Sequence, residues 1–438
     1  MLKRLGILGR GVAWTVVLNV VTTASNFAVA LLLARLLGAD GYGAFSFAFA
    51  WAMVLSSVAG LGLSPLVVRH VAAMEARHDW SGLRGLLRWS TGLVAGSSAL
   101  TTIVAALVGL AFLHEDLLGP YLLGLGLVLP TALVLVRQSA MQGLGRVVLG
   151  RVPETLVMPV LFLVLAALFG TALSGFSARA AVALLLVSAL VAFLVGTILL
   201  ARTLPAAVRA AAPRYDRRSW ARSAAPLLLL GVAGVVSVQV GTILLGVFAE
   251  PEETGVFALA LRLSAFASFL FMASMYPLMP TVARLHSLER TDELRATVGR
   301  AARAVFLFSL PIAVGIAVLA EPLLGLFGDE FRSGADAVRI LVLGEIAKVF
   351  LGLSGLVLVM TGREDDLARG VVAGAVVTTA LSLALIPRFD VVGAAVATSL
   401  GALATHLLLT LLSRRRLGFA GAAWWGQAGT RNRGSSHE

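Results

Sequence analysis

The strongest constraint in this chain is a series of apolar segments that are each long enough to cross a lipid bilayer. A membrane-spanning helix needs about 20 mostly apolar residues, and twelve segments of the sequence meet that requirement, two of them interrupted by charge. They are 11–37, 41–68, 89–113, 117–136, 155–178, 180–201, 223–249, 254–283, 304–327, 336–360, 370–387 and 391–413. Backbone polar groups in lipid must be satisfied within the segment, so these stretches are expected to be helices. The sequence therefore predicts an all-α polytopic membrane protein with twelve spans.

Several chemistries are excluded by what the sequence lacks. It has no cysteine, and its two lysines, Lys3 and Lys348, do not lie in a phosphate-binding P-loop motif. Its six histidines form no metal-binding spacing. We therefore expect no cofactor, no metal site and no enzymatic activity encoded by the chain itself.

The basic residues predict the orientation of the chain in the membrane. If the N-terminus is cytoplasmic and the spans alternate, the inner segments hold 27 Lys and Arg residues and the outer loops hold 3. Such an excess on one side is the positive-inside signal, and it predicts a multi-pass protein of the cytoplasmic (inner) membrane with both termini in the cytoplasm. The net charge of +12 then reflects topology and attraction to the inner leaflet, and no nucleic-acid partner is expected.

The two halves of the chain resemble each other. Gly43 and Phe45 in the first half correspond to Gly255 and Phe257 in the second, at an offset of 212 residues, and weaker matches follow in the same order. An even number of spans in each half makes both halves run in the same direction, which predicts two six-helix lobes related by a pseudo-two-fold axis along the membrane normal. The predicted parts are an N-terminal lobe at 1–201, a cytoplasmic interlobe linker at 202–222, a C-terminal lobe at 223–416 and a cytoplasmic tail at 417–438.

Two like lobes around a central cleft are typical of alternating-access transporters, whose substrate sites lie between repeats. Charged residues inside the membrane usually face a cavity or each other, and this chain places Arg262, Glu345 and Lys348 within spans. In the functional interpretation, Arg262 and Lys348 present positive charge to an anionic substrate, and Glu345 takes a coupling ion or holds Lys348 in place. In the structural interpretation, Glu345 and Lys348 are a buried ion pair, because residues three apart share a helix face, and Arg262 is a strut between the lobes.

Weaker polar candidates lie on spans of both halves. Asn19 and Asn26 share one face of the first span, and Gln239 lies on the corresponding span of the second half. They are candidate cavity-lining residues, although interhelical hydrogen bonding explains them nearly as well. Arg35 is expected to extend its charged end towards the membrane surface, and His406 is expected to be a packing residue.

Three runs of sequence resemble a known family. They are LLLARLLGADGYG at 31–43, VFALALR at 256–262 and IPRFDVVGAAVAT at 386–398. Together with the span count and the duplication, they are similar to the O-antigen-flippase-like polysaccharide exporters of the multidrug/oligosaccharidyl-lipid/polysaccharide (MOP) exporter superfamily, whose fold is also that of the MATE transporters.

The resemblance implies a flippase that moves an undecaprenyl-pyrophosphate-linked oligosaccharide from the inner to the outer leaflet for surface polysaccharide biosynthesis. Its expected partners are this lipid-linked oligosaccharide, membrane lipids and other polysaccharide-assembly enzymes. Arg262 and Lys348 would contact the pyrophosphate, and arginine suits this role because its planar guanidinium binds phosphate bidentately.

Other functions stay open at this point. A lipid II flippase would also carry a pyrophosphate. A cation-coupled multidrug exporter would need acidic rather than basic residues in its cavity. A membrane glycosyltransferase would need larger loops than this chain has, and a non-transporting scaffold is the remaining alternative.

Overall fold

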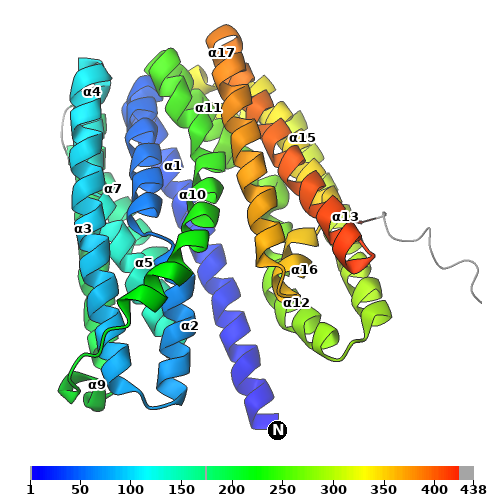
Figure 1. Ribbon diagram of the computed structural model, residues 1–438. Helices are drawn as coiled ribbons and strands as arrows, with labels where there is room; N and C mark the ends of the chain where they lie inside the picture. Colours follow the sequence, from blue (N-terminus) through cyan, green and yellow to red (C-terminus); the bar gives the residue numbers. More distant parts are fainter. Residues whose placement is uncertain (1, 173–174, 424–438) are drawn as a thin grey trace, which may run out of the picture. The chain divides into compact units, whose positions relative to one another are not determined.

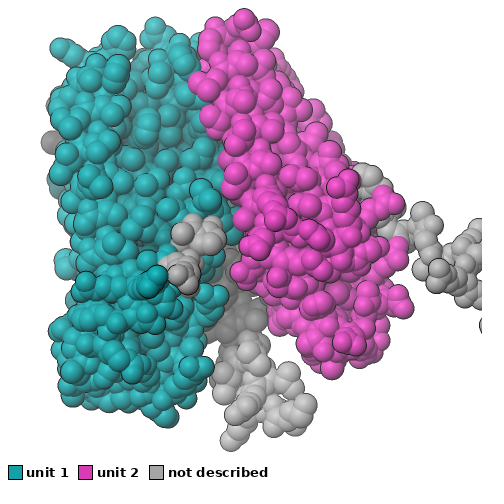
Figure 2. Space-filling view, in the orientation of Figure 1, with its two compact units in different colours: residues 1–258, 326–331 teal, residues 259–325, 332–438 magenta. Residues whose placement is uncertain are grey.

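The computed structural model describes residues 2–172 and 175–423, and all regular secondary structure in these residues is helical. The chain forms two compact units, coloured separately in Figure 2. Unit 1 comprises Met1–Ala258 and Leu326–Phe331, and unit 2 comprises Leu259–Gly325 and Arg332–Glu438. Helix α11 contributes residues to both units.

The helices of unit 1, seen in blue to green in Figure 1, are α1 (Leu2–Ala59), α2 (Leu63–Ala76), α3 (Trp80–Phe112), α4 (Glu115–Leu125), α5 (Val128–Gly143), α6 (Val147–Val152), the π-helical turn η1 (Pro153–Val157), α7 (Met158–Ala172), α8 (Ala178–Thr203), α9 (Ala206–Ala210), α10 (Arg217–Phe248) and the start of α11 (Pro251–Ala265). Those of unit 2 are the end of α11, the 3₁₀ turn η2 (Phe266–Ser268), α12 (Phe269–Ser287), α13 (Thr291–Val318), α14 (Ala320–Gly325), the 3₁₀ turn η3 (Asp329–Gly334, which begins in unit 1), α15 (Ala335–Leu351), α16 (Ser354–Met360) and α17 (Glu364–Leu417).

The prediction of a helical, multi-pass membrane protein is confirmed. Within the described residues, nine helices are long and apolar enough to cross a membrane, or ten if the bent pair 329–351 and 354–360 counts as one span. Large apolar side chains of α3 are strongly exposed: Leu100 is 64%, Leu107 63% and Phe112 81% exposed. This exposure suits a surface that faces lipid. The finer count of twelve spans stays a prediction.

Two of these helices are long enough to hold two predicted spans each. Helix α1 is 58 residues long and contains a non-helical residue, Gly38, with φ 66° and ψ −177°. Helix α17 is 54 residues long and contains a non-helical residue, Asp390, with φ 44° and ψ −122°. Both breaks fall in the short gaps that the sequence predicts between consecutive spans.

The two arms of α17 pack against each other in antiparallel orientation. A Cβ atom on Gly374 would lie 1.6 Å from Oγ1 of Thr405, and one on Gly401 would lie 1.8 Å from Oγ1 of Thr378. The contacts step backwards along the second arm as they step forwards along the first, so the chain reverses direction at Asp390. Small residues let the two helices approach closely, as is usual between membrane helices.

The predicted second span, 41–68, is divided in the structure. The second arm of α1 ends at Ala59, and α2 starts at Leu63. Between them Leu61 and Gly62 both adopt positive φ, 50° and 65°, a conformation that interrupts a helix. The apolar run is continuous in sequence, and its hydropathy alone does not show this turn.

The segment predicted as an interlobe linker, 202–222, is docked on unit 1. Val208 and Trp220 are each 2% exposed and belong to its core, and the Trp220 ring lies 5.3 Å from that of Trp89. The backbone N–H of Arg214 donates to the Ser81 carbonyl (3.0 Å), and its guanidinium pairs with Asp79. The two compact units are defined by packing, whereas the lobes 1–201 and 223–416 are predicted from the similarity of the two halves of the sequence. The lobe boundaries therefore stay a prediction.

The start of the predicted tail, 417–438, also packs. Phe419 and Ala423 are each 3% exposed in a core of unit 2. The Leu353 N–H donates to the Gly421 carbonyl (3.0 Å), and the Ala423 N–H donates to the Phe350 carbonyl (3.1 Å). Residues 424–438 lie outside the described part of the chain.

We expect Gly401→Val to destabilise the protein, because its side chain would overlap Thr378 on the other arm of α17. Overpacking of this kind costs about 1–3 kcal/mol. The unfolding temperature of the purified protein in detergent measures the effect. Gly92→Val on α3 is the control, because nothing lies within 4 Å of a Cβ atom at that position.

The same contact predicts a compensation. Thr378→Ala removes the hydroxyl that a Cβ atom at position 401 would meet at 1.8 Å but leaves the Cβ atom of residue 378 at 2.8 Å, so it should restore part of the stability that Gly401→Ala removes. Equal losses in the single and double variants would show that the arms of α17 do not pack through these residues.

Candidate functional site

The charged residues predicted inside the membrane at 345 and 348 lie together in unit 2. Both are on α15, and the Lys348 Nζ atom pairs with Glu345 Oε2. Their side chains are only 17% and 19% exposed, so the pair is largely removed from solvent. Each charge therefore compensates the other in this structure, which is the pairing that their spacing allows.

A third titratable side chain, His406, lies near this pair. Helix α15 and the second arm of α17 are joined by two hydrogen bonds, from Ser399 Oγ to the Ile340 carbonyl (3.0 Å) and from Thr410 Oγ1 to the Leu351 carbonyl (3.2 Å). Both bonds join residues 59 apart, so the two helices run parallel and His406 comes level with the residue before Lys348. Lys348 and Glu345 both act electrostatically on the His406 ring.

The contacts of His406 define its tautomer. Its Nδ1 atom lies 2.9 Å from the Ala402 carbonyl oxygen. A carbonyl accepts hydrogen bonds only, so Nδ1 must carry the proton. The ring also makes an edge contact with Phe271, with centroids 6.4 Å apart. These contacts give His406 a packing role, and its position beside two charged residues was not anticipated from the sequence.

Arg262 is also a residue of unit 2. It is half-buried on α11, one turn before that helix tightens into the 3₁₀ turn η2. Its predicted role as a phosphate partner stays a prediction.

The predicted polar cavity residues belong to unit 1. Asn26 on α1 is exposed, and Gln239 on α10 is partly buried; these two helices pack against each other. The side chain of Asn19 lies outside the described part of the structure. A role in lining a cavity stays a prediction for all three.

The sequence analysis missed a carboxylate inside unit 1. Glu154 lies within the candidate span 147–170, whereas the sequence predicted a span that begins one residue later. It belongs to the π-helical turn η1, a rare conformation that is frequent at functional sites. The Thr22 hydroxyl on α1 donates to the Thr155 carbonyl in this turn (3.0 Å).

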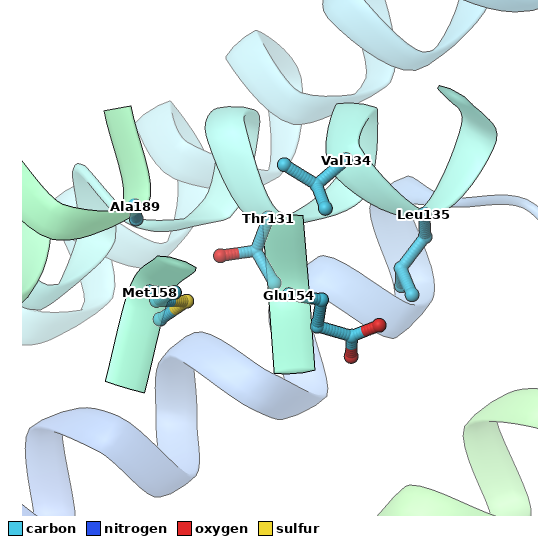
Figure 3. A pocket seen from close by; sticks show the side chains of 6 residues that line it. All are labelled: Thr131, Val134, Leu135, Glu154, Met158 and Ala189. Carbon is cyan, nitrogen blue, oxygen red and sulfur yellow. The ribbon is translucent and has the colours of Figure 1, made fainter. Parts of the chain in front are cut away.

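Glu154 lines a small pocket, together with Thr131, Val134, Leu135, Met158 and Ala189 (Figure 3). These residues come from α5, η1, α7 and α8, and Arg151 acts electrostatically on Glu154. The sequence offered one signal for Glu154: an acidic residue that lies next to Pro153, at the edge of an apolar run. Among the described residues, no three His, Asp or Glu side chains lie close enough together to hold a metal ion.

Two curated relatives cover parts of the chain. The probable flippase AglR of Haloferax volcanii is 28% identical over 162 residues, which is 36% of this chain and 34% of AglR. The chain thus spans about a third of the length of that relative. The succinoglycan biosynthesis transport protein ExoT of Rhizobium meliloti is 26% identical over 351 residues, which is 77% of this chain and 66% of ExoT.

Solved structures share the fold across nearly the whole chain. An inward-facing multidrug resistance MATE family transporter of the MOP superfamily superposes with a TM-score of 0.74, covering 91% of this chain and 94% of that one at 15% identity. The lipid II flippase MurJ superposes with a TM-score of 0.73, covering 91% and 87% at 13% identity. At these identities the likeness concerns the fold.

Residues 8–286, well over half of the chain, match the family described as "Polysaccharide biosynthesis protein". The match confirms the family resemblance seen in the sequence. The chain belongs to the polysaccharide biosynthesis protein family.

Proposed function

We propose that the protein is a flippase for an undecaprenyl-pyrophosphate-linked oligosaccharide, which it moves from the inner to the outer leaflet of the cytoplasmic membrane. The family, and the names of the similar proteins AglR and ExoT, support a transporter in glycan or polysaccharide biosynthesis. Transport proceeds by alternating access between two six-helix lobes with both termini in the cytoplasm. The 27-to-3 distribution of basic residues supports this orientation.

The observation that carries the proposal is the charge inside the membrane. The substrate has a polyprenyl tail that stays in lipid, a sugar head group that needs water and a pyrophosphate that needs cations. Arg262 and Lys348 supply two positive charges in unit 2, and Glu345 supplies one negative charge. A net positive set suits an anionic substrate and disfavours a cationic drug.

The ion pair refines the roles of these residues. While Glu345 is ionised, it compensates Lys348, and Arg262 is the principal phosphate partner. Once Glu345 takes up a proton, Lys348 is released to bind the pyrophosphate. In this mechanism, uptake of a coupling ion and binding of the anionic substrate depend on the same carboxylate.

Lipid II is the second candidate substrate, because it too is a pyrophosphate and the cation argument applies to it equally. Transport should therefore be measured with both lipids.

We expect Arg262→Ala and Lys348→Ala, alone and together, to reduce transport while membrane insertion stays normal. A hydrogen bond to a charged group contributes about 1.5–3 kcal/mol, so each variant should transport about 10- to 100-fold less. The measurement is the fraction of lipid-linked oligosaccharide, or of lipid II, that reaches the opposite leaflet of proteoliposomes containing the purified protein.

A matched control is available on the same helix. Arg339→Ala removes an exposed arginine of α15 that pairs with Asp336, and it should transport normally. Arg262→Lys keeps the charge but loses the planar fork, so it should be intermediate. Full transport by the double variant would contradict the proposed cation site.

We expect Glu345→Gln to abolish the response of transport to a proton or sodium gradient, because the amide can neither ionise nor take up the coupling ion. It should also increase binding of a pyrophosphate lipid, because Lys348 is no longer compensated. Transport with and without an imposed gradient, together with the unfolding temperature, checks both effects. A lower unfolding temperature with an unchanged gradient response would assign the pair a purely structural role.

A further inference from the structure

We propose that a set of contacts, which we call the latch, holds α1 against a distant segment at the break in this helix. These contacts must separate when substrate leaves on the outer side of the membrane. The latch consists of Arg35, Gly38, Ala39 and Tyr42 of α1 together with the segment Leu326–Phe331. That segment packs within unit 1, although the chain on either side of it belongs to unit 2. The assignment to the outer side rests on the proposed orientation and function.

The break leaves backbone groups that need partners. Gly38 is not helical, so the N–H groups that follow it lack the partners of a continuous helix. Glu330 supplies one from 291 residues away: its Oε2 atom accepts a hydrogen bond from the Ala39 N–H at 2.7 Å. A carboxylate is also electrostatically favourable at the N-terminal end of a helix, here the second arm of α1.

The contact is reciprocal. Arg35, in the last turn before the break, donates from Nε to the Leu326 carbonyl at 3.0 Å. A cation at the C-terminal end of the first arm of α1 is favourable for the same electrostatic reason. The sequence did not anticipate this hydrogen bond to a distant loop, and the expectation that Arg35 reaches towards the membrane surface stays a prediction.

Aromatic side chains also join α1 to the segment Leu326–Phe331. Tyr42 and Phe331 are 0% and 1% exposed, and their rings meet edge to face with centroids 5.9 Å apart. About two turns before Arg35 along α1, Phe27 meets Phe327 in the same way at 5.4 Å.

Beside the latch, the two duplicated turns touch backbone to backbone. Gly43 and Gly255 occupy corresponding positions of the two halves. A Cβ atom on Gly43 would lie 1.7 Å from the Pro251 carbonyl oxygen, and one on Gly255 would lie 2.2 Å from the Ala39 carbonyl oxygen. Only glycine permits this approach, so the duplication has placed two glycines where the halves of the chain meet at the latch.

The latch is built to open. Arg35 and Glu330 are both exposed, so water can replace each of their hydrogen bonds when the parts separate. Tyr42 and Phe331, by contrast, are accessible only after separation. Exposure of position 42 therefore reports the state of the latch directly, whether or not substrate is moving.

Thiol labelling tests the latch, because the chain has no cysteine and every introduced thiol is unique. Tyr42→Cys should react slowly with a membrane-impermeant maleimide added from outside, and several-fold faster once Glu330→Ala is added. Glu321→Ala is the matched control, because it removes an exposed acid of α14 that lies 4.0 Å from Arg332 and takes no part in the latch. Equal labelling rates with and without Glu330→Ala would overturn the proposal.

Crosslinking gives a second measurement that does not depend on Tyr42. Ala39→Cys with Glu330→Cys, joined by a short bis-methanethiosulfonate reagent that forms a reducible disulfide with each thiol, should hold the latch shut and stop transport until a reductant is added. The control pair is Ser354→Cys with Thr410→Cys, whose hydroxyls lie 3.2 Å apart within unit 2; its linkage should leave transport intact. Full transport by the crosslinked latch overturns the proposal, whereas a latch that opens and closes by labelling in a protein that moves no glycan would overturn only the proposed function.

Discussion

Lipid offers no partner for a backbone N–H or C=O group, and the rest of this structure depends on that constraint. It accounts for the helical architecture, but its consequences are most informative where a helix is interrupted. At Gly38, the Ala39 N–H is satisfied by the Glu330 carboxylate. At the π-helical turn η1, the Thr155 carbonyl is satisfied by the Thr22 hydroxyl. At these two interruptions, the freed groups are paired by another part of the chain, so each carries a tertiary contact.

Charged side chains inside the membrane also need partners. Glu345 and Lys348 are largely shielded from solvent and lie one turn apart on α15, so each lowers the cost of burying the other. The surroundings are closely packed: a Cβ atom on Gly344 would lie 2.7 Å from the Ser399 side chain. Each charge is compensated by the other in these surroundings, so any process that changes the charge of one member changes what the other can bind.

Hydropathy predicted the features that follow from local sequence. The breaks at Gly38 and Asp390 fall in the predicted gaps between spans, and the spacing of Glu345 and Lys348 indicated that they can pair. It did not predict the turn at Leu61 and Gly62, because that turn lies within a continuous apolar run and is fixed by backbone conformation. Nor did it predict that Trp220 would insert into the core of unit 1 and dock the segment 202–222, since its surroundings in sequence are rich in arginine.

In the candidate site too, local sequence predicted some features, whereas tertiary packing determined others. Glu154 was missed because the edge of a span was placed by hydropathy, and a carboxylate beside Pro153 reads as a loop residue. His406 was recognised as a packing residue, but its position beside Lys348 depends on the register between α15 and α17, which two distant hydrogen bonds establish. Register between helices is a tertiary property, and no single segment of the sequence encodes it.

The close approach of Gly43 and Gly255 lies beside these long-range contacts. Corresponding turns of the two halves carry Gly43 and Gly255, and the close approach of their backbones leaves no room for a side chain. Once two like turns meet in this way, a carboxylate from a later loop can reach the break in α1, and an arginine from α1 can reach that loop. The two glycines let the backbones approach, and the backbone groups freed at Gly38 find their partner in the Glu330 carboxylate.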